Sequence, residues 1–402
     1  MKPFVGTKDI RVRIRIGVGM RLTIFFIALV FSAHSFGEFK LTEQECSTIQ
    51  LDAEGETLEN HPFLGQGSTG TCYSHASSKL IDHHIMKTEG VPFHSSPMVN
   101  AILFQAAING DDLYGGNNNC QLLNTANREG VCPREKFEGT FKVKDFEPLL
   151  MELSRIYKSY SKGRSKKKDA IVARIQKKLE RKHKLESTKP PTTIQVQNSL
   201  DQGSFGDFLK VLLVDSYCPD RKIMNTPISC DEKRIFSPDE SESSRSIHQG
   251  LEHGNPTAIE ICGNVLSNSS YVGVNWESED LARGNRNATA SAGGDDPCRA
   301  HWLTVIGREW QNGSCHFKLY DSMNSRSFTE GKISISEKKI GLNIFQYTSI
   351  YSFSESLRGK RQLVKPGEVG SAQTYQLGGS RDGERKFREP ETYTTSEVLA
   401  DE

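Results

Sequence analysis

The spacing of apolar residues changes along the chain from helical to strand-like. Apolar positions recur at helical spacing from Cys72 onward, after a glycine-rich stretch. The segments 97–109 and 121–129 also predict helices, and Gly130 follows the second as a helix-terminating residue. Later, β-rich runs cover 257–265, 302–306, 316–320 and 345–353. The pattern predicts an α+β chain, mainly helical at first and ending in a compact antiparallel sheet or barrel.

A basic stretch between about 145 and 191 separates the two patterns. Its lysines and arginines surround a thin apolar stripe at i, i+4 and i+8, formed by Ile171, Ile175 and Leu179. We interpret the stretch as a solvated surface helix inserted between two lobes. A polyanion-binding arm is the alternative. The absence of aromatic residues from 162 to 189 argues against nucleic acid as the partner.

The two ends of the chain have compositions that do not predict a folded core. Basic residues precede an apolar run at 22–31 that is too short to span a bilayer comfortably, and small residues follow at Ala33, Ser35 and Gly37. This is typical of a signal peptide, with Met20 as an alternative start and an uncleaved membrane anchor as the competing interpretation. The C-terminal end is polar and rich in Gly, Glu, Arg and Thr. The expected map is a signal peptide at 1–37, a helical lobe at 38–144, a basic helical insertion at 145–205, a β-rich lobe at 206–356 and a disordered tail at 357–402.

Composition and charge narrow the choice of partners. With 36% hydrophobic and 25% charged residues, the chain resembles a globular protein. The formal net charge of +1 provides no global field that would select nucleic acid or acidic lipid. We therefore expect a secreted or periplasmic protein with no nucleic-acid partner and no membrane association after signal cleavage. The oligomeric state is left open.

The nine cysteines fit an exported protein, because disulfides persist outside the cytosol. If one thiol stays free for catalysis, eight remain to pair. Short spacings favour pairing Cys218 with Cys230 and Cys298 with Cys315. No two cysteines have the C-x-x-C spacing of a structural zinc site, so no metal is expected.

Cys72 is the strongest candidate for chemistry. A thiol attacks a carbonyl as the thiolate, which the positive end of a helix N-terminus favours, and a helix is predicted to begin at Cys72. The preceding glycines leave room for a substrate backbone. Gln66, six residues upstream, has an amide that the loop could fold back beside the thiolate to polarise an oxyanion.

The spacing of Gln66 and Cys72, with an aromatic residue and a helix following, resembles the active-site block of papain-like cysteine peptidases, the cathepsin family. Further blocks follow in the order of that family. The segment 114–117, followed by a helix, is similar to the glycine-pair segment, 254–260 to the strand that opens the β-rich domain, and 300–307 to the histidine strand. The segment 317–322 falls where the family has its Asn-Ser-Trp block.

The resemblance implies a role for each matching residue. Gln66 would be the oxyanion donor, Cys72 the nucleophile, His301 the general base and then acid, and Asp321 the residue that orients His301. Substrate contacts would come from Gly115, Gly116, Glu260 and Ala300. Neither a metal nor an organic cofactor is implied. His75, His83 and His84, on the predicted catalytic helix, are interpreted as structural or exposed.

Departures from the family pattern leave alternatives open. Thr69 stands where relatives have a disulfide cysteine, Tyr73 replaces a tryptophan, and Asp321 replaces an asparagine, with Asn324 nearby as a second candidate. The usual long inhibitory prosegment is not expected before Gln66. The leading hypothesis is a cysteine endopeptidase that hydrolyses polypeptides through an acyl-enzyme thioester. An inactive peptide-binding protein, and an acyltransferase or amidase acting on cell-wall peptide, are the alternatives.

Overall fold

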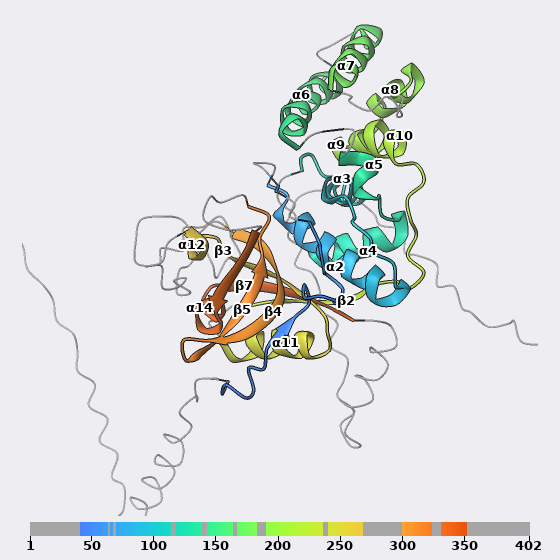
Figure 1. Cartoon of the computed structure of the whole chain (residues 1–402). Coiled ribbons are helices and arrows are strands. Elements are labelled where there is room, and N and C mark those ends of the chain that lie inside the picture. The colour runs from blue at the N-terminus through green and yellow to red at the C-terminus, as the bar shows by residue number, and fades with distance from the viewer. Residues whose placement is uncertain are drawn as a thin grey trace, which may run out of the picture. The chain divides into compact units, whose positions relative to one another are not determined.

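The computed structural model describes residues 41–62, 65–66, 70–113, 118–138, 141, 143–163, 167–182, 190–235, 240–267, 300–323 and 331–351 (Figure 1). The expected signal peptide at 1–37 and tail at 357–402 lie outside these ranges. The fold is α+β, as predicted, with a helical region first and an antiparallel sheet after it. Among the described residues, no helix combines the length and apolar character needed to cross a membrane.

The helical region contains α2 (Cys72–Glu89), α3 (Pro97–Ala107), α4 (Asn119–Glu129), α5 (Arg134–Glu138), α6 (Val143–Ser161), α7 (Lys168–Lys182), α8 (Thr193–Leu200), α9 (Phe205–Leu209) and α10 (Asp215–Tyr217), with a π-helical turn at Lys210–Val214. The predicted helices 97–109 and 121–129 correspond to α3 and α4. Local sequence explains their starts, since the side chain of Ser96 accepts from Val99 N before Pro97, and that of Asn118 accepts from Gln121 N. Both helices begin where the chain supplies its own cap.

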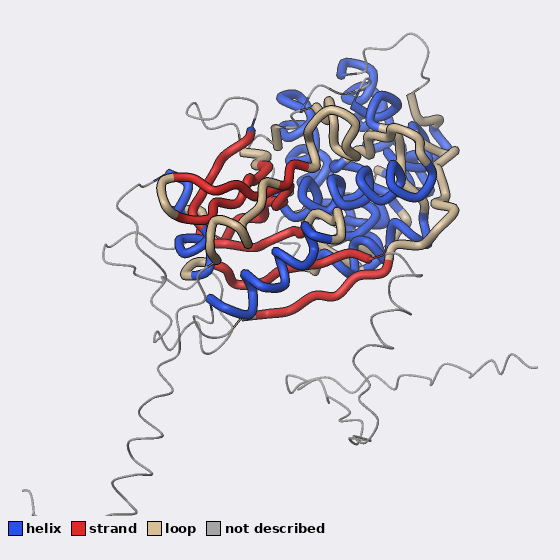
Figure 2. The backbone as a smooth tube through the Cα atoms, turned by 60° about the horizontal axis from the view of Figure 1, so that its bottom comes forward, coloured by secondary structure: helices blue, strands red, loops and turns tan. Residues whose placement is uncertain are grey.

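The strands are β1 (Ile49–Gln50), β2 (Ser229–Arg234), β3 (Thr257–Cys262), β4 (Ala300–Gln311), β5 (Ser314–Tyr320), β6 (Lys332–Ser336) and β7 (Ile344–Tyr351). They pair antiparallel in the order β2-β7-β3-β4-β5-β6, and β1 adds to β4. Short helices accompany the sheet: α11 (Glu240–Glu252), α12 (Asn264–Ser267) and α14 (Glu337–Gly341). Figure 2 shows the sheet on one side of the described residues and the main group of helices on the other.

The two parts meet where α2 packs on β4. Trp302 is buried in the same apolar cluster as Tyr73 and Leu80 of α2, and Thr304 Oγ1 donates to Ala76 O over 3.4 Å. Successive side chains of a strand point to opposite faces, so Trp302 and Thr304 share the face that α2 covers. This contact brings the start of α2 close to the start of β4.

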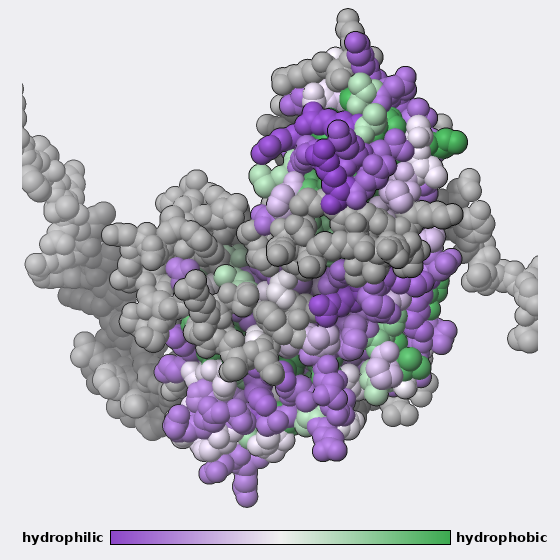
Figure 3. Space-filling model, turned by 45° about the horizontal axis from the view of Figure 1, so that its top comes forward, coloured by the Kyte–Doolittle hydropathy of each residue, from purple (hydrophilic) through white to green (hydrophobic). Residues whose placement is uncertain are grey.

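The basic stretch is better integrated than the sequence suggested. Ile171, Ile175 and Leu179 of α7 are buried in an apolar cluster that also contains residues of α3, α6, α8 and α9. The stripe is therefore a packed helix face, and interpreting it as a solvated helix in a loop was wrong. The opposite face is charged, as Figure 3 shows by its largely hydrophilic surface over these helices.

The helical part also extends further than the predicted boundary at 205/206. That boundary falls inside α9, which packs against α3. The contact is close, since a Cβ added at Gly206 would lie 2.5 Å from Ala106 N. Only glycine fits this crossing without a shift of backbone. In the structure the helices continue to Tyr217, and β2 begins at Ser229.

Three disulfides cross-link distant segments: Cys46–Cys315, Cys120–Cys230 and Cys132–Cys218. The predicted pairs of Cys218 with Cys230 and Cys298 with Cys315 are therefore wrong, because tertiary contact rather than short spacing brings the sulfurs together. Cys262 is also disulfide-bonded, and Cys298 lies outside the described residues. Among the described cysteines, Cys72 is the free one.

Removing the Cys132–Cys218 bridge should destabilise the fold. The bond closes a loop across a sequence separation of 86 and is fully buried. We expect replacement of both cysteines by alanine to lower the free energy of unfolding by about 2–4 kcal/mol, since the unfolded chain gains freedom. Urea unfolding followed by circular dichroism measures the change, and an unaltered free energy of unfolding would contradict this pairing.

Candidate active site

Cys72 lies at the first position of α2, as the helical spacing predicted. The Thr71 side chain makes no capping bond there, and the first turn contains no acidic residue. The unpaired backbone N–H groups of the first turn therefore favour an anion at Cys72. The residue is partly exposed, whereas the following residues of α2 from Tyr73 to Ile85 are buried. The sulfur thus lies at a helix N-terminus in a position that is open to solvent.

His301 is brought to Cys72 from the start of β4. Its Nε2 lies 2.6 Å from Asp321 Oδ1, and the side chains of this pair are 5% and 1% exposed. The imidazole also interacts with Cys72. Because Nε2 meets the carboxylate, Nδ1 is the ring nitrogen left for the sulfur. The strand places the ring between a thiol and a carboxylate.

The electrostatic environment favours the imidazolium form of His301. Burial alone lowers its pKa, because the charged ring loses water. The hydrogen bond to Asp321 and the interaction with Cys72 outweigh burial and raise the pKa to about 9. A protonated ring between two groups that can carry negative charge is the arrangement expected for a thiolate-imidazolium pair.

Asp321 is itself fixed by the backbone after β5. Its N–H donates to Gly331 O over 2.7 Å, and its Oδ1 accepts from Met323 N over 2.8 Å. The carboxylate is fully buried. These bonds fix the side chain relative to His301 without relying on exposed contacts. The alternative residue Asn324 lies outside the described residues.

Gln66 is held against the same segment. Ser322 Oγ donates to Gln66 Oε1 over 2.7 Å, and Gln66 N donates to Ser322 O over 2.9 Å. The side-chain bond occupies the oxygen of the Gln66 amide, so the nitrogen is the end that can donate to a substrate oxygen. Sequence analysis identified Gln66 but not the residue that orients it. The adjacency of Ser322 to Asp321 was the signal that could have identified it.

The predicted substrate contacts differ in where the structure places them. Ala300 is exposed and precedes His301 on β4. Glu260 is 3% exposed on the inner strand β3, paired with Trp302 and Gln346. Gly115 and Gly116 lie outside the described residues. The structure therefore brings together Gln66, Cys72, His301 and Asp321, and the four substrate contacts stay predictions.

The other histidines of α2 make internal contacts. His83 Nδ1 lies 2.6 Å from Thr57 Oγ1, and His84 Nε2 lies 2.8 Å from Thr226 O. His75, His83 and His84 are all buried. Sequence analysis gave them structural or exposed positions, and the contacts of His83 and His84 fit the structural interpretation.

Comparison with solved structures gives distant similarities. No family model matches the chain, and no curated protein matches it. Among solved structures, the chain is similar to digestive procathepsin L 3 from the larval midgut of Tenebrio molitor, with a TM-score of 0.40 and 10% sequence identity. The match covers 78% of this chain and 74% of that chain.

Proposed function

We propose that the chain is an exported papain-like cysteine endopeptidase. The observation that carries the proposal is the position of His301, buried between Cys72 and Asp321, with its pKa raised to about 9 by these two neighbours. A histidine that keeps its proton near neutral pH beside a thiol is suited to maintain a reactive thiolate. The order of the sequence blocks supports the same family.

The geometry supports a two-step hydrolysis. The Cys72 thiolate attacks the peptide carbonyl carbon and forms a C–S bond, while the carbonyl electrons move to oxygen. The Gln66 amide donates to this oxyanion. His301 then gives its proton to the leaving amine, the C–N bond breaks, and a thioester remains. Neutral His301 takes a proton from water as the water oxygen attacks the thioester carbon. The tetrahedral intermediate collapses, the C–S bond breaks, and the carboxylic acid leaves, which restores the Cys72 thiolate and protonated His301.

Asp321 contributes both orientation and charge. The hydrogen bond that Asp321 accepts from His301 Nε2–H keeps Nδ1 of the ring directed to the sulfur. The carboxylate also stabilises imidazolium more strongly than a neutral amide would. The pair should therefore persist to higher pH than it would with asparagine at this position.

Export and substrate class complete the proposal. The disulfides of the chain suit an oxidising compartment, which supports a secreted or periplasmic location. The substrate is a polypeptide, with Gly115, Gly116, Glu260 and Ala300 as proposed contacts. The negative charge of Glu260 would favour substrates with a basic residue two positions before the scissile bond.

Digestion of a mixed peptide library by the wild type and by Cys72→Ala tests the proposal. New amino termini that appear with the wild type alone, identified by mass spectrometry, support endopeptidase activity. Intact peptides that bind in both proteins would instead indicate a binding protein. Transfer of acyl groups to an added amine, or release of stem peptide from purified cell wall, without peptide cleavage would indicate the acyltransferase or amidase alternative.

Ser322 provides a finer test of the oxyanion donor. We expect Gln66→Ala to lower kcat about 10²–10³-fold, the usual cost of losing one such donor. Ser322→Ala should lower kcat by a smaller factor, because the amide remains but loses its orienting bond. The two changes should be less than additive, since both act through one amide. Fully multiplicative effects on kcat in the double variant would contradict the link between Ser322 and Gln66.

A further inference from the structure

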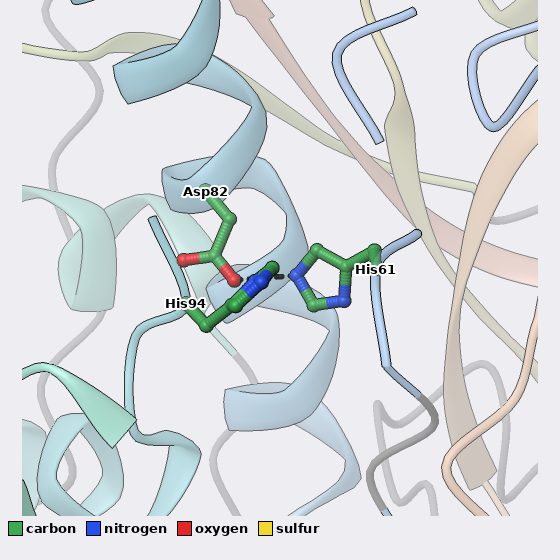
Figure 4. A group of neighbouring side chains, drawn as sticks. All are labelled: His61, Asp82 and His94. Carbon is green, nitrogen blue, oxygen red and sulfur yellow. Dashed lines mark hydrogen bonds and ion pairs between the residues drawn. The ribbon is translucent and has the colours of Figure 1, made fainter. Parts of the chain in front are cut away.

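A second cluster of chemically capable side chains lies away from Cys72. His61, Asp82 and His94 come from the segment before α2, from α2 itself and from the segment between α2 and α3. Figure 4 shows the carboxylate and the two imidazole rings turned toward one another. Asp82 lies about 15 Å along the axis of α2 from Cys72, at 1.5 Å per residue. The cluster is thus distinct from the candidate active site.

The donor set is one that metals of the zinc class prefer. One ligand atom from each of the three residues lies within 4.8 Å of the other two. Two imidazole nitrogens and a carboxylate oxygen, with a fourth position left for water, are a common set for Zn²⁺. Bonds of about 2.0–2.2 Å to zinc need ligand atoms about 3–4 Å apart, so only small side-chain rotations are required.

Most of the cluster is buried, with His94 of intermediate exposure, and its polar atoms are incompletely satisfied. The side chains of His61 and Asp82 are 5% and 0% exposed, and His61 Nε2 lies 2.6 Å from Asp82 Oδ2. His94 Nδ1 is buried and has no hydrogen-bond partner among the described residues. A buried polar nitrogen without a partner is costly, so the site has an unused ligand atom where a cation could bind.

Neighbouring groups hold the ligands in place. Ser95 N donates to Asp82 Oδ1 over 2.8 Å, which leaves Oδ2 to face the histidines. Lys79 Nζ contacts the opposite nitrogen of His61, Nδ1, and also donates to Pro62 O and lies over the ring of Tyr320. The lysine therefore contacts Nδ1 of His61 while Asp82 meets Nε2, and its ammonium also interacts electrostatically with Asp82. Fixed outer contacts of this kind orient metal ligands.

We propose that His61, Asp82 and His94 form a binding site for Zn²⁺ or a closely similar divalent metal, with the fourth position left for water. The metal would tie the segment that leads to Gln66 to helix α2. A second group of candidate ligands, His248, Cys315 and Glu337, is excluded because Cys315 is in a disulfide. Sequence analysis expected no metal because it looked for closely spaced cysteines, whereas these three ligands are separated along the chain.

Zinc titration of metal-free Cys72→Ala protein by calorimetry tests the site. This background removes the thiolate, which could itself bind zinc, and it makes the result independent of hydrolase activity. We expect one equivalent to bind and the thermal unfolding midpoint to rise with zinc. Co²⁺ bound in place of zinc should give the visible absorption bands of a tetrahedral site. It should not give the charge-transfer band of a thiolate ligand.

Variants of the ligands decide where the metal binds. In the Cys72→Ala background, His94→Ala should lower zinc affinity at least ~10-fold and remove the thermal shift. It should leave the circular dichroism of the metal-free protein unchanged, because the His94 Nδ1 atom makes no hydrogen bond to lose. His61→Ala provides a second ligand variant. His253→Ala, at an exposed histidine, serves as the matched control and should keep full affinity. Absence of zinc binding in Cys72→Ala, or equal affinity in His94→Ala and His253→Ala, would overturn the proposal.

Discussion

Cys72→Ala and His301→Ala should each lower kcat/KM for a peptide substrate by at least ~10⁴-fold, because they remove the nucleophile or its proton carrier. The two losses should not multiply in the double variant, since either change alone disables the same pair. Steady-state kinetics on one fluorogenic peptide measures all three variants. Thermal unfolding should change little for Cys72→Ala, because the residue is partly exposed and alanine removes only one sulfur atom.

His253→Ala is the control for histidine replacement, since its ring is exposed just after α11 and its Nδ1 contacts the carbonyl of Gln249 in that helix. It should retain full turnover. Residual activity in Cys72→Ala within ~10-fold of the wild type would contradict the assignment of Cys72 as nucleophile.

Asp321→Asn should move the alkaline limb of the kcat/KM profile to lower pH by about one unit or more. In the wild type the pKa of His301 is raised to about 9, with the hydrogen bond to Asp321 as the largest raising cause. The imidazolium form is therefore present below this pH and is lost as the pH rises through it. The amide oxygen of asparagine can still accept a hydrogen bond from Nε2–H, but the side chain carries no negative charge. The imidazolium of His301 therefore loses its proton at lower pH in this variant.

Activity near neutral pH should survive in part in Asp321→Asn, because the orientation of the ring is kept. Asp321→Ala is the matched comparison and should lose activity at every pH, since it removes orientation as well as charge. The apparent pKa belongs to the coupled pair of Cys72 and His301 rather than to either residue alone. An alkaline limb that stays in place in Asp321→Asn would mean that Asp321 does not act on His301, and Asn324 would become the residue to replace.

Local pattern was sufficient to predict much of the fold. Apolar periodicity, with Gly130 as a helix-terminating residue, led to α3 and α4, and β-rich runs led to β3, β4, β5 and β7. The α+β class followed from their order. The strand β2 was not predicted, because it ends in four consecutive charged residues, from Asp231 to Arg234, on a partly exposed edge. Its pairing with β7 depends on tertiary contact. The helix α11 was not predicted either.

Features that depend on contacts between distant parts of the chain could not be predicted from the sequence. The disulfide of Cys46 with Cys315 spans a separation of 269, and no short spacing indicates it. The burial of Ile175 depends on helices that fold over it from both sides. The candidate site could be predicted from the sequence for a different reason. The motifs that contain Gln66, Cys72, His301 and Asp321 follow one another in a recognisable order along the chain. The residues of the His61 cluster have no such order, and only the fold brings them together.

Labelling by an epoxide thiol trap tests the central proposal most directly, because only an activated thiolate in a substrate groove reacts quickly. The proposal predicts one label per chain, located at Cys72 by peptide mass spectrometry, with a rate that falls at least ~10²-fold in His301→Ala. A competing peptide substrate should slow the reaction in the wild type. If Cys72 stays unlabelled, or reacts equally fast in wild type and His301→Ala, the residue is not an imidazole-activated nucleophile and the endopeptidase proposal is contradicted.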